Sequence, residues 1–139
     1  MTVTLTNNLA TKLAAWKAAA QTGLKAGTAA GAAIFEAHAK ENAPVLSGRL
    51  RDGIHTEIVV DTDAQQQLMV TPVVPASNAY GFDPPYARRI EMGFIGTDSL
   101  GRHYHQAPEP YMEPAYDEGK SDAYDALSSG VLNALKGAA

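Results

Sequence analysis

The sequence has no cysteine and few aromatic residues, with 1 Trp, 3 Phe and 6 Tyr among 139 residues. The absence of cysteine excludes a disulfide framework and any cysteine-ligated zinc site, and it suits a reducing cytoplasm. The apolar stretch Ala26–Phe35 is far shorter than the roughly 20 residues that a membrane span needs. Residues 1–8 show neither the basic nor the apolar region of a signal peptide. We therefore expect a single domain, residues 1–139, that does not enter a membrane.

An excess of basic charge is absent as well. The chain has 11 Lys plus Arg against 15 Asp plus Glu, a formal net charge of −4. Residues 1–106 contain nine of each sign, so the excess acid lies in residues 107–139, which have two basic and six acidic side chains. A net negative chain is a poor candidate for binding duplex DNA on its own. The five arginines all lie in the middle, as a solvated surface or as a subunit contact, where arginine is favoured: Arg49, Arg51, Arg88, Arg89 and Arg102.

The N-terminal third reads as one long helix, from about Leu5 to Asn42. An apolar stripe follows steps of three or four residues, through Leu9, Leu13, Trp16, Ala20 and Leu24. Gly23, Gly27 and Gly31 recur at every fourth position and leave one face on which another backbone can approach closely. A kink or break near Gly27 or Gly31 is the alternative, because glycine weakens a helix interior. Pro44 ends the helix.

The middle of the chain, residues 44–106, reads as β structure with a short helix. Ile54, Thr56, Ile58 and Val60 alternate with more polar residues, and Gln67–Val74 is rich in β-branched residues, so an antiparallel hairpin is predicted. Pro72 confines the second strand to an edge or a bulge. After a Pro75–Asp83 loop we expect a helix over Pro85–Met92, closed by Gly93. Phe94–Gln106 then predicts a small projecting hairpin with apolar and histidine side chains: Phe94, Ile95, Leu100, His103 and His105.

The C-terminal segment, residues 107–139, starts with a proline elbow. Three prolines in Pro108–Ala115 cannot continue a strand, and Pro114 can occupy the first turn of the helix that follows. Tyr111 and Met112 are the expected anchors of the elbow. The helix is predicted to point these side chains toward the core: Tyr116, Tyr124, Leu127, Val131, Leu132 and Leu135. The predicted fold is α+β, with the long N-terminal helix (residues 1–43) and the C-terminal helix packed on a small, mostly antiparallel β-sheet.

No combination of residues indicates catalysis. His103 and His105 lie two apart and share one face if they form a strand, but two ligands do not make a metal site, and nothing in the spacing brings Glu91, Asp98 or Glu109 to them. Neither Ser47 nor Ser99 is in a GxSxG turn, and the segment Gly96–Arg102 lacks the Lys-Ser/Thr ending of a phosphate loop. We expect no enzyme activity, no cofactor and no metal.

Three segments resemble motifs of one protein family. Ala43–Arg51 (APVLSGRLR) resembles A-P-x-x-[ST]-G-x-L-R, Tyr86–Gly93 (YARRIEMG) resembles Y-A-x-x-[IV]-E-x-G, and Pro110–Ala115 (PYMEPA) resembles P-[FY]-[LM]-x-P-A. Their order after a long N-terminal helix is similar to that in the small tail-component proteins of long-tailed bacteriophages, the tail-completion or head–tail joining family of Hong Kong-type siphophages.

This resemblance implies a structural virion protein, assembled in the bacterial host cytoplasm. The implied product is a homo-oligomeric ring, which we expect to be a hexamer, at the neck between head and tail. Its partners would be the tail tube or tail terminator and the head closure or connector protein. Genomic DNA would pass through the lumen without sequence-specific binding, and no membrane would take part.

The residues suggest which surfaces such a ring would use. We expect an interface or fold-organising role for Arg49, Arg51, Arg88 and Arg89, with Glu91 as their nearest partner. A local Arg88–Glu91 pair worth only about 0.2–0.5 kcal/mol is the alternative. The hairpin with Phe94, Ile95 and Leu100 is either an adaptor surface or part of the subunit core. Two other functions stay open, a DNA-contacting packaging accessory and a small metal-dependent enzyme that uses His103 and His105.

Overall fold

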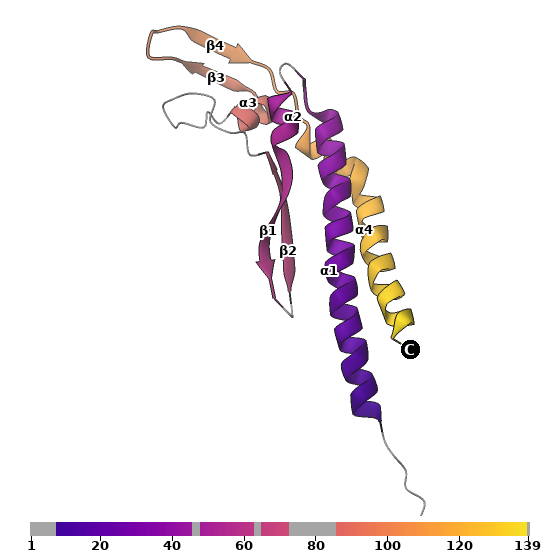
Figure 1. The fold of residues 1–139 in the computed structure, drawn as a ribbon. Coiled ribbons are helices and arrows are strands. Elements are labelled where there is room, and N and C mark those ends of the chain that lie inside the picture. Colours follow the sequence, from indigo (N-terminus) through magenta and orange to yellow (C-terminus); the bar gives the residue numbers. More distant parts are fainter. Residues whose placement is uncertain (1–7, 46–47, 63–64, 73–85, 139) are drawn as a thin grey trace, which may run out of the picture.

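The chain has the predicted α+β fold, and its described residues form four helices and two hairpins. The short helix at Arg49–Gly53 was not predicted from the sequence. The computed structural model (Figure 1) describes residues 8–45, 48–62, 65–72 and 86–138. In chain order the elements are α1 (Leu9–Asn42), α2 (Arg49–Gly53), β1 (Ile54–Asp61), β2 (Gln66–Pro72), α3 (Tyr86–Met92), β3 (Phe94–Thr97), β4 (His103–Gln106) and α4 (Met112–Gly137). The predicted Pro75–Asp83 loop lies outside the described residues. Within the described residues no helix is long and apolar enough to span a bilayer.

Helices α1 and α4 run antiparallel and meet through glycine. A Cβ atom on Gly23 would lie 2.6 Å from the carbonyl oxygen of Gly130, and one on Gly27 would lie 2.8 Å from the Cα of Leu127. Further along, a Cβ on Gly31 would lie 3.3 Å from the Ala123 carbonyl oxygen. The predicted close backbone approach is therefore confirmed. The alternative of a break is wrong, because α1 is one helix of 34 residues.

The predicted core face of α4 is wrong for its largest residues. Tyr116 is 55% exposed and Tyr124 is 66% exposed, and Leu132 is exposed as well. The buried residues of α4 are small instead: Ala115, Gly119 and Ala123. When two helix backbones come this close, only small side chains fit between them, so the large apolar side chains are displaced to the flanks.

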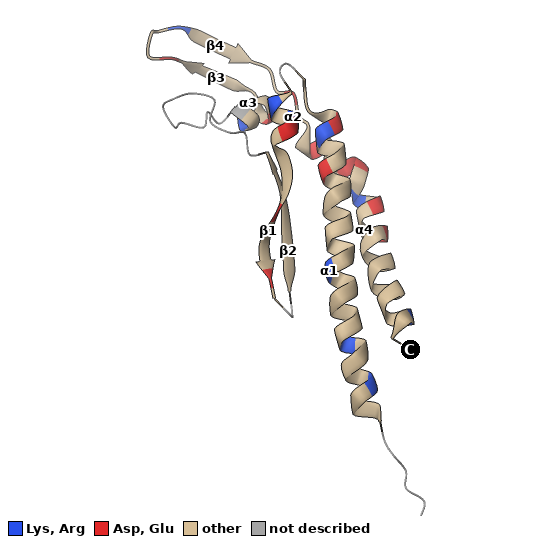
Figure 2. Cartoon of the chain, viewed as in Figure 1, with Lys and Arg blue, Asp and Glu red and all other residues tan. Residues whose placement is uncertain are grey.

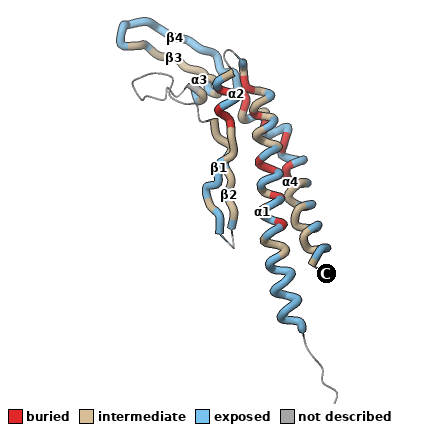
Figure 3. Tube along the Cα trace, in the orientation of Figure 1, coloured by how far each residue is buried: buried red, intermediate tan, exposed pale blue. Residues whose placement is uncertain are grey.

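The apolar stripe at the start of α1 is also outside the core. Every residue from Asn8 to Ala18 is exposed, with Leu13 at 52% and Trp16 at 43%. Figure 3 shows that α1 continues past the C-terminal end of α4, so this part of the helix has no covering layer among the described residues. The stripe exists as predicted, but the part of the helix from Leu9 to Ala18, about three turns, does not pack within the subunit.

The β1–β2 hairpin lies on the other side of α1 from α4 (Figure 1). Its strands pair antiparallel from Ile54 opposite Pro72 to Asp61 opposite Gln66, which confirms the predicted hairpin and the edge position of Pro72. The expected inward face of β1 is only partly right. Ile54 is fully buried, but Ile58 is 65% exposed next to a bulge, where an extra residue disturbs the alternation.

The β3–β4 hairpin forms a second two-stranded antiparallel sheet, so the described strands make two small sheets where the sequence suggested one. It projects from the end of the molecule where α2 and α3 lie (Figure 1). The buried core is at this same end. It consists of residues from the end of α1, from α2 and β1, and from the start of α4: Ala39, Ala43, Leu50, Ile54, Tyr111 and Ala115.

Replacing the central glycine of the α1–α4 contact should destabilise the subunit. We expect Gly27→Leu to lower the free energy of unfolding by about 1–3 kcal/mol or more, because the new side chain meets the backbone of Leu127. Ala30→Leu is the matched control on an exposed position of the same helix and should change stability by less than about 0.5 kcal/mol. Urea denaturation followed by circular dichroism measures both, and equal effects would contradict the close packing.

Candidate assembly surfaces

The side chain of Glu91, on α3, holds the N-terminus of α4. Its carboxylate accepts hydrogen bonds from the backbone N–H groups of Tyr111 at 2.8 Å, Met112 at 3.0 Å and Glu113 at 3.1 Å. A negative carboxylate is favourable at this position, since the start of a helix has unpaired N–H groups and the positive end of the helix dipole. The backbone N–H of Glu109 also donates to the Ile90 carbonyl oxygen at 2.7 Å. Helix α3 therefore fixes the direction of α4 after the proline elbow.

Pro114 completes this arrangement. It lies in the first turn of α4, as predicted, and has no N–H to satisfy. The N–H of the following residue, Ala115, donates to the Tyr111 carbonyl oxygen at 3.3 Å, the first bond inside the helix. Each backbone donor at this helix start is thus satisfied by Glu91, replaced by proline or used in the helix. The elbow has no side-chain cap of its own, so the cap comes from α3.

Within the described part of the subunit the expected pairing of Glu91 with arginine is not present, and a pairing across subunits stays a prediction. Among the described residues Glu91 forms no ion pair, and the local Arg88–Glu91 pair is not present, because the carboxylate is turned toward the elbow backbone. The N-cap position of α4 is a tyrosine, Tyr111, and not Ser, Thr, Asp or Asn. The sequence thus indicated that another part of the chain must cap this helix. Tyr111 itself is 1% exposed within the core, and Met112 packs against that core.

The four arginines of α2 and α3 are exposed at one end of the molecule (Figure 2). Arg51 is 3.5 Å from the neighbouring Asp52, a surface pair of small energetic value. The guanidinium of Arg89 lies 4.2 Å from the centre of the Phe94 ring, which links α3 to the start of the projecting hairpin. Arg49 and Arg88 lie on the same two short helices, so positive charge gathers beside the hairpin.

Asp98 organises the tip of the β3–β4 hairpin. One of its oxygens accepts the N–H groups of Leu100 and Arg102 at 2.9 Å, and the other accepts the Arg102 Nε–H at 2.7 Å and the Tyr104 hydroxyl at 3.0 Å. These bonds, first of all that from the Arg102 backbone, hold the pKa of Asp98 below its ordinary value. The stabilisation from this carboxylate is therefore present above its ordinary pKa and is lost as the pH falls through the lowered one.

The hairpin presents apolar side chains to solvent. Ile95 is 77% exposed and Leu100 is 76% exposed, whereas Phe94 is half-buried against Arg89 and Gly96. His103 and His105 lie on β4 and are exposed, with His103 Nδ1 2.9 Å from the Thr97 hydroxyl oxygen. A search of the described residues finds no group of three or more side chains that could hold a metal ion.

An apolar groove runs along α1 between β2 and α4, with a cavity volume of about 400 Å³. Its floor consists of small residues, including Gly31 and Ala123, because the two helices meet closely there. Larger side chains form the walls: Phe35 from α1, Leu68 and Val70 from β2, and Tyr116, Tyr124 and Leu127 from α4. Sequence reasoning missed this groove because it placed the two tyrosines in the core.

The described part of the subunit therefore has a small core, a close-packed helix pair and exposed apolar surfaces. The chain matches the family described as "Bacteriophage HK97-gp10, putative tail-component" over residues 5–93, and it belongs to that family. It is accordingly a bacteriophage tail component, a protein of the virion. No curated protein and no solved structure matches the chain.

Removing the cap at the N-terminus of α4 should weaken the contact between α3 and α4. We expect Glu91→Ala to lower the free energy of unfolding by about 1–2 kcal/mol, because three N–H groups lose their acceptor. Hydrogen exchange at the amides of Met112 and Glu113 should accelerate at the same time. Glu109→Ala removes an exposed carboxylate from the same elbow and is the control. Equal stability of the two variants would contradict the capping role.

Proposed function

We propose that this tail component forms a ring at the head–tail junction of a long-tailed phage. In this role it joins the tail tube, or its terminator, to the head closure or connector protein, and leaves a channel through which the genome passes. The work is done by shape and contact, without cofactor, metal or sequence-specific reading of DNA. The ring is expected to be a hexamer, assembled in the host cytoplasm and retained in the neck of the virion.

The distribution of large apolar side chains carries the proposal. Tyr111 and Ile54 are the large side chains fully buried among the described residues. Large apolar side chains on α1, β1, β2, α3, the projecting hairpin and α4 are exposed instead, including Trp16, Ile95 and Tyr124. A monomer that stayed in solution would leave these surfaces in water, so they are better explained as surfaces that other subunits and virion proteins cover.

The charges support a head-to-tail contact between subunits. A ring requires heterologous contacts, in which one face of each subunit meets a different face of the next. Positive charge lies on α2 and α3, with Arg49, Arg51, Arg88 and Arg89, whereas residues 107–139 have a net charge of −4. Surfaces of opposite sign on different faces of one subunit favour this kind of contact and select its orientation.

Reversing the charge on α2 should disturb assembly without unfolding the subunit. We expect Arg49→Glu and Arg51→Glu together to reduce the yield of joined heads and tails by about tenfold or more, because like charges then meet across the contact. The circular dichroism spectrum and melting temperature should stay close to those of the unchanged protein, since both side chains are exposed.

Lys136→Glu is the matched control, because it removes one exposed positive charge from the far end of α4. Joined particles counted by electron microscopy are the readout. A normal yield from the doubly reversed variant would remove α2 from the ring contact.

The projecting hairpin is proposed as the adaptor that binds a neighbouring neck protein. Ile95→Ser with Leu100→Ser should leave folding unchanged, because both side chains are largely exposed, but should prevent the joining of tails to heads. Met92→Ser changes an exposed apolar side chain on α3 and is the control. Unfolding of the double variant would assign the hairpin to the subunit core, and normal joining would exclude the adaptor role.

A further inference from the structure

The groove between α1, β2 and α4 has the dimensions of a helix-binding site. Its lining on α1 extends from Gly27 to Ala39, about 18 Å along a helix that rises 1.5 Å per residue. Apolar walls and a floor of small residues allow another helix to come close, with its large side chains between Tyr116 and Leu68. The groove is open to solvent on the described surface, since Tyr116 and Tyr124 on its wall are exposed.

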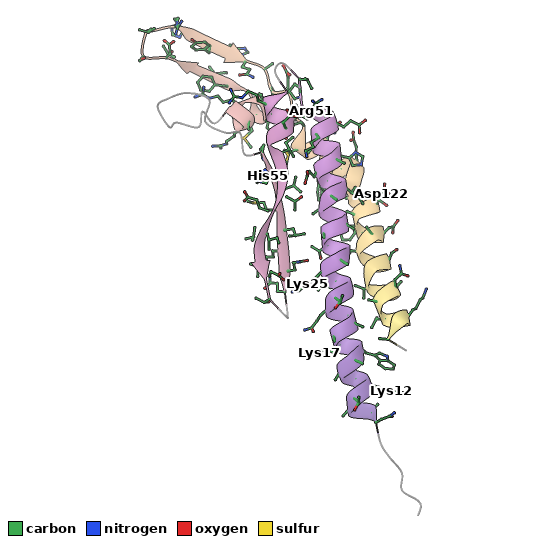
Figure 4. The ribbon with its side chains drawn as sticks, viewed as in Figure 1. Lys12, Lys17, Lys25, Arg51, His55 and Asp122 are labelled. Atoms are coloured by element: carbon green, nitrogen blue, oxygen red, sulfur yellow. The ribbon has the colours of Figure 1, made fainter. Side chains whose placement is uncertain are left out.

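The start of α1 has the complementary form. Leu13, Trp16, Ala20 and Leu24 lie on one face of the helix over a length of about 16 Å, close to the length of the groove. Leu13, Trp16 and Leu24 are exposed. Anchors at such spacing are the usual means by which an amphipathic helix fills an apolar groove. Lys12 and Lys17 lie on either side of this face, and neither has an ion-pair partner among the described residues (Figure 4).

The same subunit cannot bring these two surfaces together. Trp16 and Phe35 belong to one uninterrupted helix and are 19 positions apart, which separates them by about 28 Å. The helix that enters the groove must therefore come from another molecule. Because this helix is part of every copy, a second copy of the chain supplies it wherever the protein self-associates.

The distribution of charge favours a second copy of this chain as the source of the helix that enters the groove. From Asn8 to Leu24 the described residues include two lysines, Lys12 and Lys17, and no acid, whereas the next lysine, Lys25, is already paired with Asp61 of the same subunit at 2.6 Å. The first half of α4, which forms one wall of the groove, has five acids and one lysine: Glu113, Asp117, Glu118, Asp122 and Asp125 against Lys120. Figure 2 shows these opposite signs at opposite ends of the helix pair.

Two of the acids border the groove itself. Glu113 and Asp117 are helix neighbours of Tyr116 and Lys120, which line it. The one cation of this wall, Lys120, is neutralised by Asp117 at 2.8 Å. Asp117 is neutralised by the same pair, so the negative charge at this edge comes from Glu113. A helix flanked by lysines would thus meet apolar side chains in the groove and the Glu113 carboxylate beside it.

We propose that the first turns of α1 from a second copy of this chain occupy the groove between α1, β2 and α4. The contact is heterologous, with a lysine-flanked helix on one copy and an acid-bordered groove on the next. It is a second contact between neighbouring copies, beside the contact of the α2 arginines, and it rests on the proposed oligomer. Its test is separate from the test of the oligomer, because it asks whether two defined residues from different copies are in contact.

The absence of cysteine from the sequence makes cross-linking a clean test. Two full-length variants, Leu13→Cys and Tyr124→Cys, each place one thiol on an exposed position, so both should fold. Mixed at a concentration where the protein self-associates and oxidised with diamide, they should form the mixed disulfide dimer as the main product. Disulfides form only when the two Cα atoms come within about 7 Å, so the product reports direct contact.

The competing occupant is the projecting hairpin of a second copy, which also has exposed apolar side chains. Leu100→Cys mixed with Tyr124→Cys tests it, and a yield at least about tenfold below that of the Leu13→Cys pair is expected. Preferential linkage through Leu100→Cys would overturn the proposal. An oligomer that forms without the Leu13–Tyr124 linkage would also overturn it while leaving the ring intact.

If the protein stays monomeric at every concentration, the proposal is overturned as well, and the occupant of the groove would have to be another virion protein. If the linkage instead forms within an isolated dimer, the groove contact stands and the ring proposal fails.

A charge variant provides a second readout. Lys12→Glu with Lys17→Glu should weaken self-association by about tenfold or more at low salt, and the difference should shrink as salt is raised. Lys136→Glu, a lysine in the last turn of α4 outside the groove, should leave self-association unchanged. Unchanged association of the Lys12 and Lys17 variant would overturn the charge argument for a second copy.

Discussion

The close contact between α1 and α4 is the constraint on which the rest of the subunit depends. Gly27 meets the backbone of Leu127 where no side chain fits, so the helix pair is held by small residues along its length. Large apolar side chains are consequently displaced to the flanks, and Tyr116 and Tyr124 become the wall of a groove. A helix pair that stabilised itself with large side chains would have no such surface left for partners. The close packing of the two helices and the exposed apolar groove are two consequences of the same spacing.

The other end of the molecule determines where these surfaces point. Tyr111 fills the small core, and Glu91 satisfies the N–H groups at the start of α4 from the neighbouring helix α3. Helix α3 also contacts the projecting hairpin through Arg89 and Phe94. One short helix thus connects the direction of α4 with the position of the hairpin. A binding event at the hairpin would act on the same element that holds the helix pair in place.

Much of this architecture could be predicted from the sequence, because its signals are local. The glycine spacing of α1 predicted the close helix contact, and the prolines of Pro108–Ala115 predicted where α4 begins. The groove could not be predicted, since it depends on which face of α4 turns toward α1. The cap could not be predicted either, since it depends on where the fold places Glu91 of α3 relative to the start of α4. Hydrophobic periodicity favoured Tyr116 and Tyr124 for that face, but backbone proximity selected Ala123 and its small neighbours. The family follows from motifs, whereas the assembly surfaces follow from packing.

The central claim is that the exposed apolar surfaces belong to an assembly of this chain. Native mass spectrometry of the purified, full-length protein over a concentration series tests it most directly. The account predicts a shift from monomer to one closed oligomer of fixed mass, which we expect to be a hexamer, without intermediate species dominating. A protein that remains monomeric at every concentration, both alone and with the tail-tube protein proposed as its partner, would contradict the account.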